Sequence, residues 1–300
     1  MPIRELFHVM TMVDDFDPAQ DVVDDLFDPV MMFSKSWSDF DKRWASISLI
    51  GSDFSFELME ASKLDEDAGA PLPKFARRFG QHLHSFAWYV DRDDMPDLVA
   101  ALIEHGVRVV RPDGSLIELA DVADVPGTVF THGRDTFGQM EFQAWNDRDP
   151  RFAPDWPEER WRTEHPLGLQ RLQYTTVLVH DLDRARGLFA GVLGGRPVAE
   201  RDDDDSSRAY VLVGTDTMVE LVQPKGTDSV EGRELAANGE LPSAMTLLVR
   251  DLDAARQHVE QAGVPIVEQG PDTFVADTSA TLGLAFTITT ALIPGDPRDA

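Results

Sequence analysis

The chain has 300 residues, 42% of them hydrophobic, no cysteine, and 54 acidic against 27 basic side chains, for a formal net charge of −27. This length and apolar content suffice for one large core or two ordinary ones, and the length favours two domains. The negative charge would repel phosphate backbones and anionic lipid heads, and the lack of cysteine excludes disulfides, thiolate metal sites and thiol nucleophiles.

The N-terminal half reads as one unit of strand, helix and three strands that occurs twice. Apolar and β-branched content with turn signals predicts the first copy as a strand at 7–13, a helix from Asp17-Pro18, and strands at 30–36, 44–50 and 54–60. After a connector at 61–80, the second copy is predicted as a strand at 82–90, a helix at about 94–105, and strands at 107–110 and near 128 and 138.

A change of composition separates the two halves of the chain. Residues 146–169 contain four prolines and two tryptophans, a mixture typical of a stiff segment that packs against a domain. We therefore expect an N-terminal domain at 1–145, a linker at 146–169 and a C-terminal domain at 170–300.

The C-terminal half shows the same unit in two further copies. An Asp-Leu-Asp helix start followed by an Ala-Arg pair stands at 181–186 and again at 251–256, each time directly after an apolar strand. Strands are expected after each helix. The chain thus predicts an α+β fold made of four βαβββ modules paired into two domains.

Two histidines and two glutamates occupy matching places on four strands of the N-terminal half, namely His8, Glu57, His84 and Glu141. Two neutral imidazoles suit a divalent cation of intermediate hardness, and two carboxylates balance its charge. The four side chains are candidate ligands of one metal ion.

Paired βαβββ modules, with a histidine opening the first strand and a glutamate closing the fourth, resemble the vicinal oxygen chelate superfamily, which includes glyoxalases, bleomycin resistance proteins and extradiol dioxygenases. The resemblance covers about 5–145 and 170–290. It implies two glyoxalase-like domains with curved, mostly antiparallel sheets. It also implies that His8, Glu57, His84 and Glu141 bind one divalent ion, which could be Fe, Mn, Ni, Co or Zn.

The resemblance leaves two residues of the N-terminal site open. The family's histidine stands five residues before a valine, whereas Val90 is six after His84, so Ser85 is in phase unless a bulge intervenes. His82 has the same parity as His84 and is the alternative ligand. His132 resembles a histidine that precedes the last strand in methylmalonyl-CoA epimerases, which makes it a candidate catalytic residue facing the substrate.

The C-terminal half serves as an internal control. Alignment of its modules places Tyr174, Glu220, Ala244 and Phe286 at the four ligand positions. Alanine and phenylalanine cannot bind a cation. We therefore expect the C-terminal domain to lack a metal and to act as a scaffold or partial lid.

Three functions fit these residues. In the first, the metal chelates two oxygens of a small molecule while Glu57, Glu141 or His132 moves a proton, as in an isomerase, epimerase or lyase. In the second, His8, His84 and Glu141 form the iron triad of an extradiol-type dioxygenase. The third is a non-catalytic binding or resistance protein with an apolar cleft, lined by Met10, Met12, Phe86 and Trp88.

The expected partner is a small-molecule substrate, and the sequence leaves a homodimer open. The N-terminus lacks a basic segment followed by an apolar one, and no apolar run reaches the length of a membrane span. A cytoplasmic location is the expectation.

Overall fold

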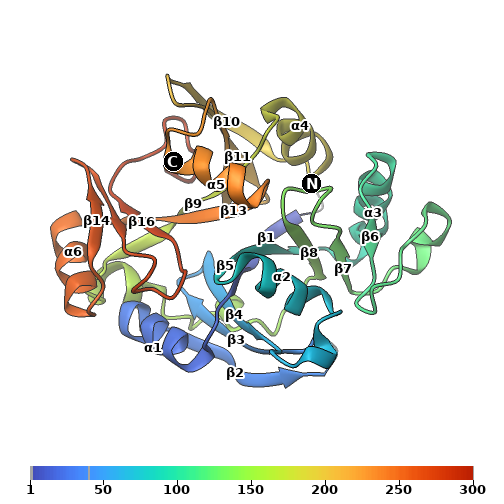
Figure 1. The fold of residues 1–300 in the computed structure, drawn as a ribbon, viewed down its shortest axis with the longest axis horizontal. Coiled ribbons are helices and arrows are strands. Elements are labelled where there is room, and N and C mark those ends of the chain that lie inside the picture. The colour runs from blue at the N-terminus through green and yellow to red at the C-terminus, as the bar shows by residue number, and fades with distance from the viewer. Residues whose placement is uncertain (1–2, 40, 300) are drawn as a thin grey trace.

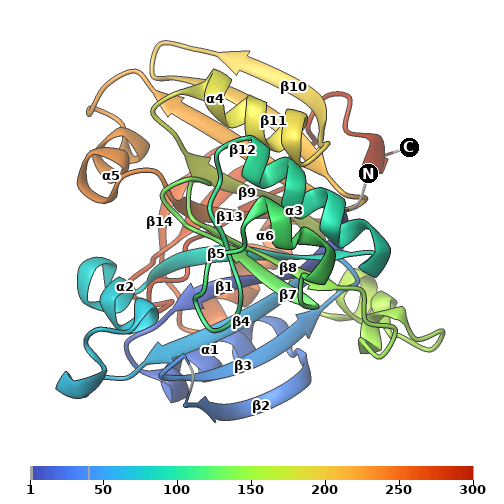
Figure 2. The same ribbon diagram turned by 90° about the vertical axis from the view of Figure 1, so that its right-hand side faces the viewer.

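The computed structural model describes residues 3–39 and 41–299, and its strands form two eight-stranded sheets, one in each half (Figure 1, Figure 2). The N-terminal sheet contains β1 (Ile3–Met12), β2 (Val30–Ser38), β3 (Arg43–Ile50), β4 (Phe54–Ala61), β5 (His82–Val90), β6 (Val109–Val110), β7 (Thr128–Thr131) and β8 (Gln139–Ala144). The C-terminal sheet contains β9 (Leu169–Leu178), β10 (Arg196–Asp202), β11 (Ser206–Val213), β12 (Thr217–Pro224), β13 (Pro242–Val249), β14 (Ile266–Gln269), β15 (Thr273–Ala276) and β16 (Phe286–Thr289).

Strand order shows the four modules directly. The order is β2-β3-β4-β1-β5-β8-β7-β6 in one sheet and β10-β11-β12-β9-β13-β16-β15-β14 in the other. In each module the first strand pairs in parallel with the fourth, and antiparallel pairing of β1 with β5 and of β9 with β13 joins two modules. The predicted α+β fold of four βαβββ modules in two glyoxalase-like domains is therefore confirmed.

One helix follows the first strand of each module, and one further helix joins the two modules of each half. The module helices are α1 (Phe16–Phe27), α3 (Met95–Glu104), α4 (Leu182–Arg186) and α6 (Leu252–Gln261), and the joining helices are α2 (Pro71–Phe79) and α5 (Val230–Asn238). Helix α1 buries Phe16, Ala19, Val23 and Phe27, which recur at helical spacing along one stripe. None of the helices in the described ranges is both long and apolar enough to cross a membrane.

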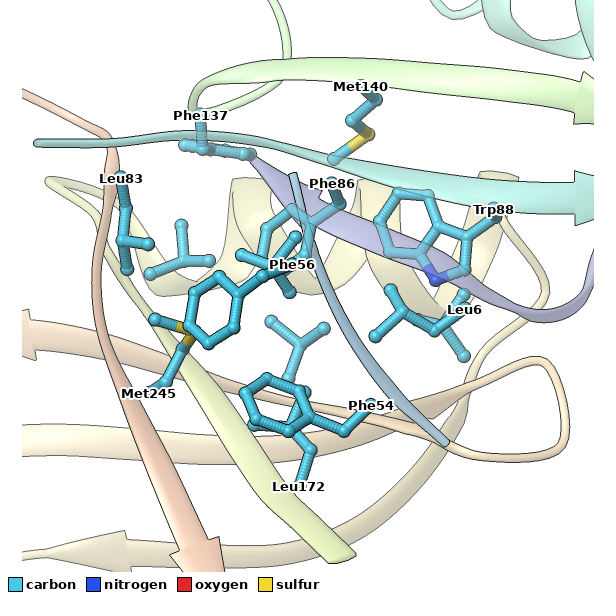
Figure 3. Close-up of a cluster of buried hydrophobic side chains, with 14 of the residues drawn as sticks. Leu6, Phe54, Phe56, Leu83, Phe86, Trp88, Phe137, Met140, Leu172 and Met245 are labelled. Carbon is cyan, nitrogen blue, oxygen red and sulfur yellow. The ribbon is translucent and has the colours of Figure 1, made fainter. Parts of the chain in front are cut away.

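The two sheets share one apolar core (Figure 3). Phe56 and Phe86 of the N-terminal sheet lie there with Leu172 and Met245 of the C-terminal sheet. Within this core, Trp88 Nε1 of the N-terminal sheet donates a hydrogen bond to Thr217 Oγ1 of the C-terminal sheet at 3.1 Å. Each half therefore buries apolar surface that the other half covers.

Of the four residues expected to line an apolar cleft, Met10, Met12, Phe86 and Trp88, only Met10 lines a described cavity. Phe86 and Trp88 are 1% and 0% exposed in the shared core, whereas Met10 and Met12 pack in a separate cluster on the opposite face of the sheet. An irregularity in β5, described below, changes which residues share a face. We call the two sides the core face and the site face.

Residues 145–168 connect the two sheets, and we propose that the domain boundary lies in this segment. Trp161 anchors it: the ring is 1% exposed, stacks on Trp156 at 5.4 Å, and donates from Nε1 to Phe27 O at 2.8 Å. The segment is thus tied to the N-terminal half through α1.

An Asp-Pro-Arg motif fastens the first strand of each half. Arg151 pairs with Asp149 at 2.7 Å and donates to Leu6 O at 3.1 Å and to Phe7 O at 3.0 Å, next to His8. The second copy repeats this contact on β9. Arg298 pairs with Asp296 at 2.7 Å and donates to Leu172 O at 3.2 Å and to Gln173 O at 2.7 Å. The structural repeat thus extends beyond β8 and β16.

Replacing Arg151 with methionine should destabilise the protein by about 3–5 kcal/mol, because it leaves the buried Asp149 carboxylate without its partner. The free energy of unfolding in urea measures the effect. Arg148→Met, at an exposed position three residues away, is the control. Equal stability of the two variants would contradict this role for the motif.

Candidate active site

The register of the central strands brings three of the four candidate ligands together on the site face. His8 on β1 pairs with Ala87 on β5, and Ala87 pairs with Glu141 on β8, so His8 and Glu141 flank one small residue. On the other side of β1, Glu57 of β4 pairs with Met10. Glu57 Oε2 lies 3.2 Å from His8 Nδ1.

A break in the pairing of β5 turns His84 toward the same face. Met10 pairs with Ser85 and Thr11 with Leu83, so His84 stands opposite no residue of β1. Such an extra residue is a β-bulge, which changes the face of the residues beyond it. His84 is 7% exposed, and its Nδ1 lies 2.6 Å from Ser85 Oγ. The additional residue between His84 and Val90 was the sequence signal of this bulge.

The alternative ligand, His82, points elsewhere. Its Nε2 lies 2.8 Å from Glu234 Oε1 on α5, and its Nδ1 lies 2.7 Å from Leu83 O. Both ring nitrogens are therefore engaged in contacts outside the site, one of them with the C-terminal half.

Arg43 on β3 is a member of the site that the sequence analysis missed. Its Nη1 donates to Glu57 Oε1. Burial raises the pKa of Glu57, but the neighbouring Arg43 and His8 outweigh this and lower it to about 2. Glu57 is thus an anion held between two nitrogen donors. No motif marks Arg43, although its place on the strand beside Glu57 was predictable.

Burial shifts the pKa values of Glu141 and His84 in the directions that favour their neutral forms. The pKa of Glu141 is raised to about 7, chiefly by burial, with His8 lowering it and Glu57 raising it. The pKa of His84 is lowered to about 4, by burial and then by Arg43. At neutral pH His84 is therefore an uncharged imidazole, the form that can bind a metal.

The donor atoms can be compared with the needs of a metal ion. As they stand, no three histidine, aspartate or glutamate side chains of the described residues form a group that could hold one. His8 Nδ1 lies 3.2 Å from Glu57 Oε2, and the described contacts include no hydrogen bond to the Glu141 carboxyl. The residue types suit a divalent cation, whereas their positions in this structure do not bring three of them around one ion, and Glu57 is paired with Arg43.

A cavity of about 280 Å³ opens beside these groups. Its lining includes Arg43, His84 and Glu141 from the sheet, together with Asp41, Met10, Met59, Leu72, Phe130 and residues 110–114. Residues 111–114 begin a long loop between β6 and β7, so a loop forms part of the wall. The cavity suits a small molecule.

His132 does not line this cavity. It faces a neighbouring cavity of about 650 Å³, which it shares with His84. Its Nδ1 lies 3.1 Å from an Nη atom of Arg108. A molecule would contact both His132 and Glu141 only if it extended through the two cavities.

Residues 171–286 match the family model described as the glyoxalase/bleomycin resistance protein/dioxygenase superfamily, and both halves share one module pattern. The C-terminal half is therefore similar to this superfamily, and the N-terminal half shares its module pattern. The matched segment lies in the C-terminal half, so the match does not extend to the four candidate ligands. No curated protein matches the chain.

Solved structures show how far the fold is shared. A mutant of 4-hydroxymandelate synthase from Streptomyces coelicolor aligns with 100% of this chain and 97% of its own, with a TM-score of 0.68 and 11% identity, which shows a common fold. Methylmalonyl-CoA epimerase from Mycobacterium tuberculosis aligns over 40% of this chain and 87% of its own at 23% identity. The epimerase of Streptomyces coelicolor aligns over 43% and 99% at 20% identity. Both epimerases have TM-scores of 0.38, which support no further argument.

At two of the four positions that correspond to the candidate ligands, the C-terminal half has residues other than those expected. The pairings that relate His8, Ala87 and Glu141 recur as Tyr174, Thr246 and Thr287, so Thr287 replaces the expected Phe286. Phe286 lies instead in the shared core, 5.5 Å from Phe56.

The second difference arises from a bulge in β13, like the bulge at His84 in β5. Pro242 pairs with Val177 and Ala244 with Thr176, which leaves Ser243 opposite no residue. Ser243, and not Ala244, is therefore the counterpart of His84. Glu220 accepts hydrogen bonds from Thr176, Tyr210 and Arg208 at 2.7, 2.7 and 3.1 Å.

Glu141 should titrate near pH 7 in metal-free protein, because burial favours its neutral form. Infrared difference spectra between the wild type and Glu141→Gln should show a protonated carboxyl band that disappears as the pH rises through about 7. Binding of a metal to Glu141 should remove the band at all these pH values. A band that is absent at pH 5 would contradict the assignment.

Proposed function

We propose that this protein is a divalent-metal-dependent enzyme whose active site lies in the N-terminal half. Its reaction is proton transfer on a small oxygenated molecule, of the isomerase, epimerase or lyase type. The proposal is supported by one observation above all: strand register and a bulge bring His8, Glu57, His84 and Glu141 to one face, beside a cavity of about 280 Å³.

His8, His84 and Glu141 would hold the metal, and Glu57 would join them if it left Arg43. A divalent cation supplies a Lewis acid that stabilises negative charge on the oxygens of a bound molecule. Fe, Mn, Ni, Co and Zn all suit imidazole and carboxylate ligands. The proposed donor set suits all of these metals and does not distinguish among them.

The carboxylates have different access to a bound molecule. Glu141 lines the cavity, whereas Glu57 is 2% exposed behind it and is fixed by Arg43 and His8. Glu141 is therefore the carboxylate better placed to exchange a proton with a bound molecule, because it lines the cavity. His132 would act only on a substrate that extends into the neighbouring cavity.

A second candidate is an extradiol-type dioxygenase. The pairing of Arg43 with Glu57 favours it, because this leaves two histidines and Glu141 as ligands, the set that non-heme iron oxygenases use. The two candidates differ in whether Glu57 binds the metal. The third, a binding protein without catalysis, requires that no metal bind.

Metal content is the test of the proposal. Protein purified without chelators or nickel columns should contain about one divalent metal ion per chain, as a single mononuclear site requires. Glu141→Ala should lose both the metal and activity. Glu220→Ala, at the matching position of the C-terminal half, should retain the metal. Absence of metal after reconstitution would contradict the enzyme and support a binding protein without catalysis. Loss of metal from Glu220→Ala would indicate that the metal site lies in the C-terminal half.

Glu57→Gln separates the two enzymes. If Glu57 is a ligand, the substitution should weaken metal affinity by about tenfold or more, as measured by competition with a chelator. Unchanged affinity, together with iron in the wild type and oxygen uptake with catechols, would support the dioxygenase.

A further inference from the structure

Helix α2 directs one face into the cavity of about 650 Å³ that His132 faces, which is larger than the cavity at the proposed active site. This face consists of residues at the spacing i, i+3, i+4, i+7 and i+8, namely Pro71, Lys74, Phe75, Arg78 and Phe79. The other walls are residues 132–134, 138–139 and 238–241, the last group from the C-terminal half. The cavity thus lies between the two halves of the chain.

Three cationic side chains around this cavity have no carboxylate partner. Lys74, Arg78 and Arg134 form no ion pair and donate no side-chain hydrogen bond within the described residues, whereas most other arginines do. The acid in the lining, Glu240, is already engaged by Arg184 at 2.9 Å and by the His180 N–H at 2.9 Å. The cavity therefore has uncompensated positive charge.

The positive charge around this cavity is opposite in sign to the net charge of the protein. The protein has a net charge of −27, so acidic partners are abundant elsewhere on its surface. Lys74 and Arg78 also stand one helical turn apart, where like charges destabilise a helix. An anion bound between them would remove both the repulsion and the excess charge.

The larger cavity adjoins the proposed active site. Pro71, His84 and Gln139 line both cavities. The ring of Phe75 lies 4.5 Å from that of His84, and Phe79 lies 4.6 Å from Phe75, so an apolar wall leads away from the site. Arg78 lies over the Phe79 ring at 4.8 Å, at the outer end of this wall.

We propose that the larger cavity is an anion subsite, and that the substrate has a phosphate or carboxylate group joined by an apolar segment to its oxygenated end. This rests on the proposed function for the oxygenated end alone. Lys74, Arg78 and Arg134 bind the anion, Phe75 and Phe79 contact the apolar segment, and the oxygenated end reaches His84 and Glu141.

Calorimetry with three aromatic probes tests the subsite in the protein as purified. Phenyl phosphate should bind more tightly than benzoate, and benzoate more tightly than benzyl alcohol, because the charge falls in that order. Binding of phenyl phosphate should weaken with added salt, as for exposed charges. The order of the two anions shows whether phosphate or carboxylate is preferred, and equal binding of the neutral alcohol would overturn the subsite.

Two triple variants with the same change in net charge complete the test. Lys74→Gln/Arg78→Gln/Arg134→Gln should weaken phenyl phosphate binding by about tenfold or more, while retaining the metal and the folded spectrum. The control is Arg77→Gln/Arg148→Gln/Arg196→Gln, at exposed positions outside the cavity, which should change binding less than about twofold. Equal weakening in both variants would overturn the subsite.

The subsite and the proposed function can fail separately. Binding that survives the first triple variant and is lost in Glu141→Ala would place the phosphate at the metal and overturn the subsite. A wild type that contains no metal, but binds phenyl phosphate through the three cations, would overturn the proposed function and leave the subsite supported.

Discussion

The pairing of β1 with β5 is the interaction on which the N-terminal half depends. It joins two modules into one sheet, and it brings both histidines to the centre of that sheet. In a regular pair, His84 would share the core face with Phe86 and Trp88, because side chains alternate along a strand. Because of the bulge at His84, that histidine lies on the site face with His8, while Phe86 and Trp88 remain on the core face.

The opposite faces of this sheet make opposite contributions to stability. The core face buries aromatic rings against the C-terminal half (Figure 3). The site face buries Glu57, Glu141 and two histidines, a costly arrangement for groups that would be charged in water. Arg43 offsets part of this cost by pairing with Glu57. The apolar core must supply the rest, and that core requires both halves.

The sequence predicted the features that follow from repetition and periodicity. Alternation within strands and capped helices located the four modules, and comparison of the modules selected His8, Glu57, His84 and Glu141 as a set. Where strand register decided the outcome, prediction failed by one residue. Ala244 and Phe286 were chosen in place of Ser243 and Thr287, because a bulge shifts the pairing without changing composition. Contacts between distant segments, such as Arg151 with β1, have no local pattern. The motif shared by 149–151 and 296–298 was nevertheless visible as a repeat.

The shared core has a consequence for how this sequence can change over generations. The C-terminal half has Tyr174 and Ser243 at the positions of His8 and His84, yet Leu172, Met245 and Phe286 still cover Phe56 and its neighbours. Substitutions at those positions would expose aromatic rings of the N-terminal half to water. If the active site lies in the N-terminal half, as proposed, selection for its activity constrains the apolar residues of the C-terminal half and leaves the C-terminal cavity, lined in part by Tyr174 and Thr287, free to diverge.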